Sequence, residues 1–120
     1  MRRKHRDLKV WQEAIALVRM IYVLTDTFPK HEIYGLTSQM RRAAVSVPSN
    51  IAEGAARKST KELLQFLSIA GGSLSELDTQ LELARTIGFV TDTEACQNKL
   101  DEVHALLLAM AESLKRKLQR

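Results

Sequence analysis

The chain has 120 residues, of which 45% are hydrophobic and 27% are charged. This length suits one domain with its own core and is too short for two, and so few prolines and glycines exclude a turn-rich β-sandwich. The formal net charge of +4 favours anionic partners, and the longest apolar run, residues 105–111, excludes a bilayer-spanning helix of about 20 residues.

The first predicted helix runs from Asp7, a good N-cap, to Phe28, because Pro29 cannot continue it. Its apolar residues form two stripes instead of one. The first stripe is Leu8, Trp11, Ile15, Val18 and Tyr22, and the second is Ala14, Leu17, Ile21, Leu24 and Phe28. One bundle seam needs only one such stripe, so the second predicts a homo-oligomer.

The second predicted helix starts between Gly35 and Ser38 and ends near Arg57. Pro48 lies inside it and removes one amide donor, a defect of about 3 kcal/mol, so we expect the helix to be kinked or briefly broken there. A row of polar residues faces away from its apolar side: Gln39, Arg42, Ser46, Asn50 and Glu53. We interpret this row as an intersubunit or structural hydrogen-bond network in preference to a general-base site at Glu53.

Two capping boxes predict the starts of the third and fourth helices, at Ser59–Glu62 and at Thr91–Glu94. Leucines and alanines at 4-3-4-3 spacing give the third helix a bundle seam, and Gly88 is placed to end it. Gly71 and Gly72 lie inside that helix, where we expect them to permit close packing. Short loops between four helices predict an all-α, antiparallel up-down-up-down four-helix bundle, as one domain over residues 1–120 with short basic N- and C-terminal tails.

The positive charge is concentrated at the two ends of the chain. Residues 1–10 contain five basic residues and one acidic residue, and residues 115–120 contain four basic residues and no acidic one. In the predicted bundle both segments lie at one pole with the turn between the second and third helices. These residues form the candidate nucleic-acid-binding set: Arg2, Arg3, Lys4, Arg6, Lys9, Arg57, Lys58, Lys61, Lys115, Arg116, Lys117 and Arg120.

Such a pole would bind the phosphate backbone of RNA or DNA, since few aromatic residues are free to stack on bases. The alternative is that the charges are only solvated and complement a helix dipole.

Signatures of catalysis and of metal binding are missing from the sequence. A di-metal carboxylate site needs two Glu-x-x-His units, and only Asp101 and His104 have that spacing. Cys96 falls in an apolar seam, which indicates a core thiol. We therefore expect no enzyme activity, no cofactor and no metal, in a cytoplasmic protein without a membrane partner.

Several motifs together carry a family resemblance over residues 7–89. They include Val10-Trp11-Gln12, Phe28-Pro29, Gly35-Leu36, the run from Ser46 to Gly54, and Ala70-Gly71-Gly72-Ser73. The chain resembles the 23S rRNA-intervening sequence proteins, also called S23-type ribosomal proteins, and is similar to the accessory variability proteins of diversity-generating retroelements. The resemblance implies a bacterial four-helix bundle that assembles as a homopentamer, binds nucleic acid and associates with a reverse transcriptase.

Two functional hypotheses follow from these observations. The first is a non-enzymatic homo-oligomer, a pentamer, whose basic poles bind RNA or DNA. The second is a protein-interaction scaffold that docks a reverse transcriptase or another partner and has no nucleic-acid affinity of its own.

Overall fold

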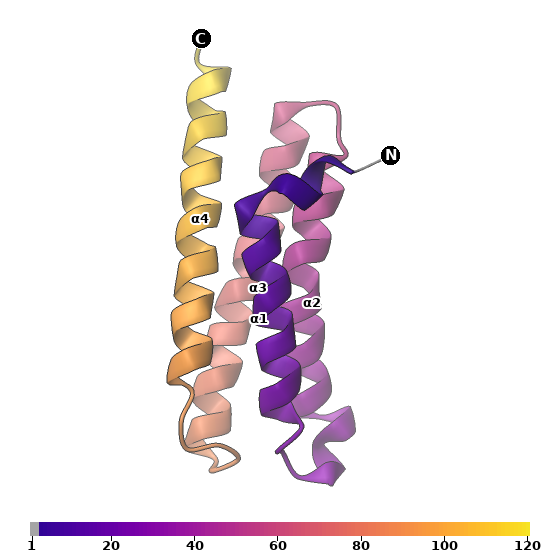
Figure 1. Ribbon diagram of the computed structural model, residues 1–120, viewed down its shortest axis with the longest axis vertical. Coiled ribbons are helices and arrows are strands. Elements are labelled where there is room, and N and C mark those ends of the chain that lie inside the picture. Colours follow the sequence, from indigo (N-terminus) through magenta and orange to yellow (C-terminus); the bar gives the residue numbers. More distant parts are fainter. Residues whose placement is uncertain (1–2) are drawn as a thin grey trace.

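The computed structural model describes residues 3–120, and these form four long helices and two short 3-10 helices without a β-strand (Figure 1). The predicted all-α fold is therefore confirmed. The elements in chain order are η1 (Lys4–Asp7), α1 (Lys9–Thr25), η2 (Lys30–Tyr34), α2 (Leu36–Ala55), α3 (Thr60–Thr86) and α4 (Glu94–Leu118).

Each long helix packs against the next one in the chain, and α1 also packs against α4. Figure 1 shows η1, the α2–α3 connection and the C-terminal end of α4 at one end of the molecule, which we call the terminal end. The α1–α2 and α3–α4 connections lie at the other end, which we call the opposite end. Among the residues that the structure describes, no helix combines the length and apolar character needed to cross a membrane.

The core is built from one apolar stripe of each helix, because burying apolar surface drives the helices together. Its largest fully buried side chains are Leu17, Ile21, Met40, Val47, Ile51, Leu74, Leu77, Leu81 and Val103. Most of the second predicted stripe of α1 is buried in this core, whereas Leu8, Trp11 and Val18 of the first stripe are partly buried and pack against it. In the first stripe, Ile15 and Tyr22 remain 44% and 42% exposed.

Both ends of α1 differ from the prediction. Asp7 is the last residue of η1, where backbone bonds close a 3-10 turn, and Leu8 is the N-cap of α1. The helix stops at Thr25 instead of Phe28. The hydroxyl of Thr25 donates to the Ile21 carbonyl at 2.7 Å, and such side-chain bonds compete with continuation of the helix.

The second helix continues through Pro48 without a break, so the expected interruption is wrong, whereas the kink stays a prediction. Pro48 is buried. Its ring therefore packs into the core, which offsets part of the cost of the missing amide donor.

Capping was predicted correctly at one of the two boxes. The Ser59 hydroxyl accepts a hydrogen bond from the Glu62 amide at 3.1 Å and donates one to the Glu62 carboxylate. At the start of α4 the N-cap is Thr93, whose side chain makes no cap bond, and Asp92 instead accepts from the Glu94 amide at 2.9 Å. The second capping box is therefore wrong, because the N-cap, Thr93, lies two residues after the expected cap, Thr91.

Glycine permits close helix contact at a position that the sequence analysis did not emphasise. A Cβ atom at Gly54 would lie 2.8 Å from Phe66 Cβ and 2.9 Å from Leu63 Cδ1, so α2 and α3 meet there only because no side chain intervenes. At Gly71 the nearest atom would be at an ordinary 3.6 Å, and at Gly72 the space is open. Contacts within one chain therefore do not explain why residue 72 is a glycine, although close packing was expected there. Gly88 has a φ of +86° and ends α3 as predicted.

Candidate nucleic-acid interface

The terminal end brings together candidate basic residues that are far apart in the sequence. Arg3 and Lys4, from the N-terminal segment, line a concavity of about 570 Å³ together with Arg57 and Lys58, which follow α2. Lys61 lies in the first turn of α3. Lys115, Arg116 and Lys117 lie in the last turns of α4, and Arg120 ends the chain. Arg2 lies outside the described residues.

Most of these cations are not paired with a carboxylate. Lys9 lies 3.5 Å from Glu13, Arg57 pairs with Glu53, and Lys115 lies 4.0 Å from Glu112. Within residues 3–120, these candidate cations make no ion pair: Arg3, Lys4, Arg6, Lys58, Lys61, Arg116, Lys117 and Arg120. Unpaired like charges repel one another, and an anionic partner would relieve that repulsion.

Aromatic contacts hold two of the arginines in place. The Arg6 guanidinium carbon lies 5.5 Å from the centre of the Trp11 ring, and the His5 ring lies 4.9 Å from it. Gln12 Nε2 also donates to the Arg6 carbonyl at 2.8 Å, which ties η1 to α1. On the other side of the concavity, the Arg57 guanidinium carbon lies 5.0 Å from the Phe66 ring. The sequence analysis placed Trp11 in a helix seam and did not foresee that it anchors the basic segment.

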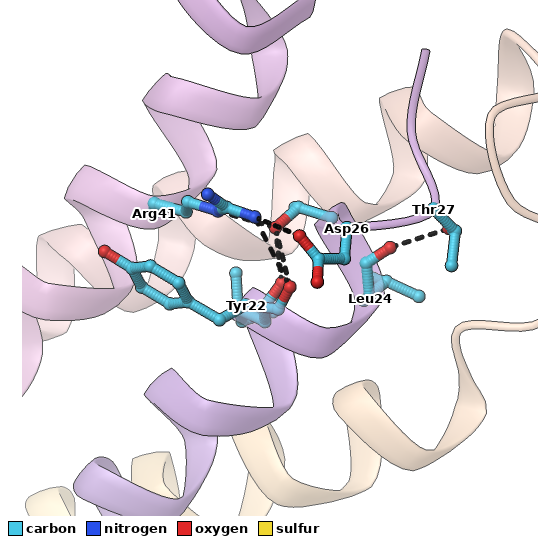
Figure 2. A network of polar contacts seen from close by, with 7 residues as sticks. Tyr22, Leu24, Asp26, Thr27 and Arg41 are labelled. Carbon is cyan, nitrogen blue, oxygen red and sulfur yellow. Dashed lines mark hydrogen bonds and ion pairs between the residues drawn. The ribbon is translucent and has the colours of Figure 1, made fainter. Parts of the chain in front are cut away.

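At the opposite end, Arg41 and Asp26 connect the end of α1 to α2. Figure 2 shows the Arg41 side chain reaching from α2 to the last turn of α1. Its Nε donates to Thr25 Oγ1 at 2.9 Å, and its Nη2 lies 3.2 Å from Asp26 Oδ1. The guanidinium also stacks 4.5 Å from the Tyr22 ring centre. A cation at a helix C-terminus is favourable because the carbonyl ends of the helix carry partial negative charge.

This Arg41 cluster was missed by the sequence analysis. The pattern QMRRAA does not distinguish Arg41 from its neighbour Arg42, and the partners of Arg41 are 15 and 16 residues away in the sequence. Only the position of Arg41 on the side of α2 that faces α1 could have indicated its role.

The polar row of α2 divides into separate parts. Asn50 Nδ2 donates to the Ser46 carbonyl at 2.8 Å and to its hydroxyl at 2.9 Å, while Ser73 Oγ of α3 donates to Ser46 Oγ at 2.8 Å. Glu53 binds Arg57 instead. The side chains of Gln39 and Arg42 are exposed and make no hydrogen bond to any residue from 3 to 120.

Ser46 and Asn50 therefore belong to a structural network that links α2 to α3, and Ser73 is a member that the sequence analysis did not include. Gln39 and Arg42 lie outside this network. Glu53 is exposed and held by an arginine, which is no arrangement for a general base.

The described residues offer no group of three or more His, Cys, Asp and Glu side chains that could hold a metal ion. Cys96 is buried, and burial raises the pKa of its thiol, so it is the protonated core thiol that the sequence indicated.

A further ion-pair group joins α1 to α4 away from both ends of the bundle. Lys99 Nζ lies 2.6 Å from Glu13 and 2.8 Å from Glu102, and the hydrogen bond from Lys99 lowers the pKa of Glu13.

Comparison with known proteins identifies a family and a fold. Residues 6–109 match the sequence model of the 23S rRNA-intervening sequence proteins, and no curated protein matches the chain. The fold is similar to a crystal structure, at 1.70 Å resolution, of a protein of unknown function from the S23 ribosomal protein family of Bacteroides thetaiotaomicron. The TM-score is 0.78 with 21% identity, over 86% of this chain and 95% of that one. At this identity the likeness concerns the fold alone, and the similarity to retroelement accessory proteins stays a prediction.

Proposed function

Since the chain belongs to the 23S rRNA-intervening sequence protein family, we propose that it is a non-enzymatic, homo-oligomeric accessory protein that binds the backbone of RNA or DNA through its terminal end. Five copies per oligomer remain our expectation. One observation carries the nucleic-acid part of the proposal, namely that the unpaired cations of η1, the α2–α3 connection and α4 gather at that one end.

The physical argument concerns counterions. Lys and Arg side chains that contact the phosphates of a polyanion release its condensed counterions, so binding through several such side chains gains free energy and weakens steeply with salt. Apart from the exposed Tyr34 of η2 at the opposite end, the aromatic rings of residues 3–120 already hold arginines or pack in the core, which favours contacts to phosphate over stacking on bases. RNA is the first probe to use because the name of the family refers to an RNA.

The experiment measures binding to unstructured single-stranded RNA and to DNA of the same sequence by fluorescence anisotropy. Between about 50 mM and about 200 mM salt, six or more phosphate contacts to a single strand would lower the affinity by about three-hundredfold or more. Trp11 is the only tryptophan. Because it touches His5 and Arg6 of η1, its fluorescence should change when RNA occupies the adjoining concavity.

A matched pair of variants separates the location of charge from its amount. The first double variant, Lys58→Gln/Lys61→Gln, removes two positive charges at the terminal end. The second, Arg19→Gln/Lys30→Gln, removes two positive charges elsewhere. The first variant should lose about tenfold or more in affinity and the second much less. Equal losses in both variants, or no binding of wild type at low salt, would contradict the proposal.

A protein-interaction scaffold is the second candidate function. The observation that favours it is the set of exposed apolar side chains, among which Tyr34 of η2 is 94% exposed. A partner such as a reverse transcriptase would cover such residues in the absence of any nucleic acid. This candidate replaces the first if wild type binds no RNA or DNA at low salt and retains its affinity for a purified protein partner.

A further inference from the structure

The groove between α1 and α2 leaves apolar side chains uncovered. It has a volume of about 510 Å³, and its walls include Tyr22 of α1, Ile33 of η2 and Val45 of α2. All three side chains are at least 40% exposed. We call this surface the α1–α2 groove, and its charged rim includes Arg42.

A second uncovered surface runs along α3 on the side turned away from the core. Ile69, Leu83 and Ile87 are 51%, 47% and 54% exposed. With Gly72 and Glu76 they follow a spacing of 3, 4, 7 and 4 residues, which keeps them on one side of the helix over about 27 Å. We call this row the α3 ridge. It is a second seam in addition to the one that α3 contributes to the core, and few monomeric helices have two.

Glycine inside the ridge has no explanation within one chain. A helix-interior glycine costs about 1 kcal/mol relative to alanine. A Cβ atom at Gly72 would have no neighbour within 4 Å, so the isolated chain does not require a glycine there. A backbone that approaches this point from another molecule would require it.

The two surfaces carry opposite charges, Arg42 in the groove and Glu76 on the ridge, and neither has an ion-pair partner among residues 3–120. The guanidinium of Arg42 makes no ion pair or hydrogen bond with residues 3–120, in contrast to the neighbouring Arg41. The carboxylate of Glu76 likewise makes no ion pair with residues 3–120, whereas Glu82 on the same helix is paired with Arg85. The groove is therefore concave, apolar and positive, and the ridge is convex, apolar and negative.

We propose that the α3 ridge of one copy docks into the α1–α2 groove of a second copy, with Glu76 of the ridge facing Arg42 of the groove. The occupant is a second copy because both halves of the complementary pair are present in one chain. If either surface paired with itself across a two-fold axis, Arg42 would lie near Arg42 or Glu76 near Glu76, which like-charge repulsion disfavours. The contact is therefore heterologous, and its repetition generates a closed ring if the rotation between neighbouring copies closes and an open filament if it does not.

This inference rests on the oligomeric part of the proposed function and assigns the surfaces that form the oligomer. It is independent of the nucleic-acid part, because neither Arg42 nor Glu76 belongs to the basic terminal end. An oligomer built by this contact would also place several terminal ends in one particle, which increases avidity for a long polyanion.

The test exchanges the charges of the pair. Arg42→Glu and Glu76→Arg are each expected to weaken self-association by about tenfold or more, measured by light scattering and sedimentation over a range of protein concentrations. The double variant Arg42→Glu/Glu76→Arg should regain association because opposite charges again face each other. Arg19→Glu and Asp101→Arg are the matched controls, since they reverse exposed charges that make no ion pair within residues 3–120 on other surfaces.

The outcomes separate this inference from the proposed function. If wild type is an oligomer and both single variants keep its mass, or if the double variant stays dissociated, the proposed contact is wrong while the oligomer stands. If Glu76→Arg is silent and Arg42→Glu is not, the groove meets a surface other than the ridge, which also overturns the inference. A monomeric wild type at tens of micromolar overturns both. Circular dichroism melting of every variant verifies that loss of association does not come from loss of folding.

Discussion

The two ends of the bundle use their charged residues differently. At the opposite end, Asp26 pairs with Arg41, Glu32 Oε1 accepts from the Leu36 amide at 2.9 Å, and Asp92 accepts from the Glu94 amide. At the terminal end, Lys58, Lys61 and most of the other basic side chains have no carboxylate partner among residues 3–120. Charged side chains therefore stabilise the fold at one end, and most of the basic side chains remain available for a partner at the other.

This difference indicates which charges matter for stability and which for binding. A charge that satisfies a helix end or a buried hydroxyl contributes to the free energy of unfolding, because its removal leaves a polar group without a partner. A charge with no partner contributes little to stability and raises the local electrostatic potential. Substitutions at the two ends should therefore have opposite consequences.

The largest effect on stability is expected for Arg41→Met at the opposite end. The variant keeps the aliphatic part of the side chain and loses the bonds to Thr25 and Asp26, so the free energy of unfolding should fall by about 2 kcal/mol. Urea denaturation measures this loss, with Arg19→Met as the control. RNA affinity should remain within about twofold of wild type. A large loss of affinity would show that a charge of the opposite end also takes part in binding RNA.

A smaller effect is expected for Glu32→Ala, also at the opposite end. The substitution removes the carboxylate that accepts from the first amide of α2, and loss of a comparable helix cap costs about 1 kcal/mol. Lys30→Ala, two residues earlier and without an ion pair within residues 3–120, should change stability by less than about 0.5 kcal/mol. Thermal melting of the two variants under identical conditions tests this order.

Charge removal at the terminal end should leave stability nearly unchanged. Lys58→Gln with Lys61→Gln is expected to alter the free energy of unfolding by less than about 0.5 kcal/mol, since neither side chain has a carboxylate partner among residues 3–120. Added salt should raise the melting temperature of wild type more than that of the variant, because salt screens a repulsion that the variant has already reduced. A strong destabilisation would show that these lysines belong to the fold.

The smallest effect is expected at Glu13, between the two ends. The hydrogen bond from Lys99 lowers the pKa of Glu13 in the folded chain. The ionised Glu13 therefore stabilises the fold at pH values above its ordinary pKa of about 4.5, and this stabilisation disappears as the pH falls through the lower pKa of the folded chain. The melting temperatures of wild type and Glu13→Gln should differ slightly at pH 7 and converge toward pH 3. Curves that stay parallel over this range would rule out the linkage.

Much of the fold could be predicted from local patterns. Leu74, Leu77 and Leu81 mark the core side of α3 by their spacing, and Ser59 and Gly88 mark its two ends. Such features depend on residues within one or two turns of each other, so periodicity and capping chemistry are sufficient to find them. The terminal basic residues were found in the same way, because their concentration is visible along the chain.

The candidate site required more than the sequence offered. The patterns treated Arg41 and Arg42 alike, and only the packing of α1 on α2 makes the first a helix-closing residue and leaves the second unpaired. Ser73 joined the network of Ser46 because α3 lies beside α2, 27 residues further along the chain. No local pattern contains that contact.

The sequence by itself determined that this protein is an all-α chain with four long helices, a leucine-rich core and positively charged ends, because helix periodicity, capping and charge are properties of short segments. Only the tertiary structure decided which side chains of the first stripe of α1 stay exposed, which arginine closes α1 and which charges remain without a partner. Those outcomes depend on which helices become neighbours, and a side chain gains or loses a partner only when two distant segments are brought into contact.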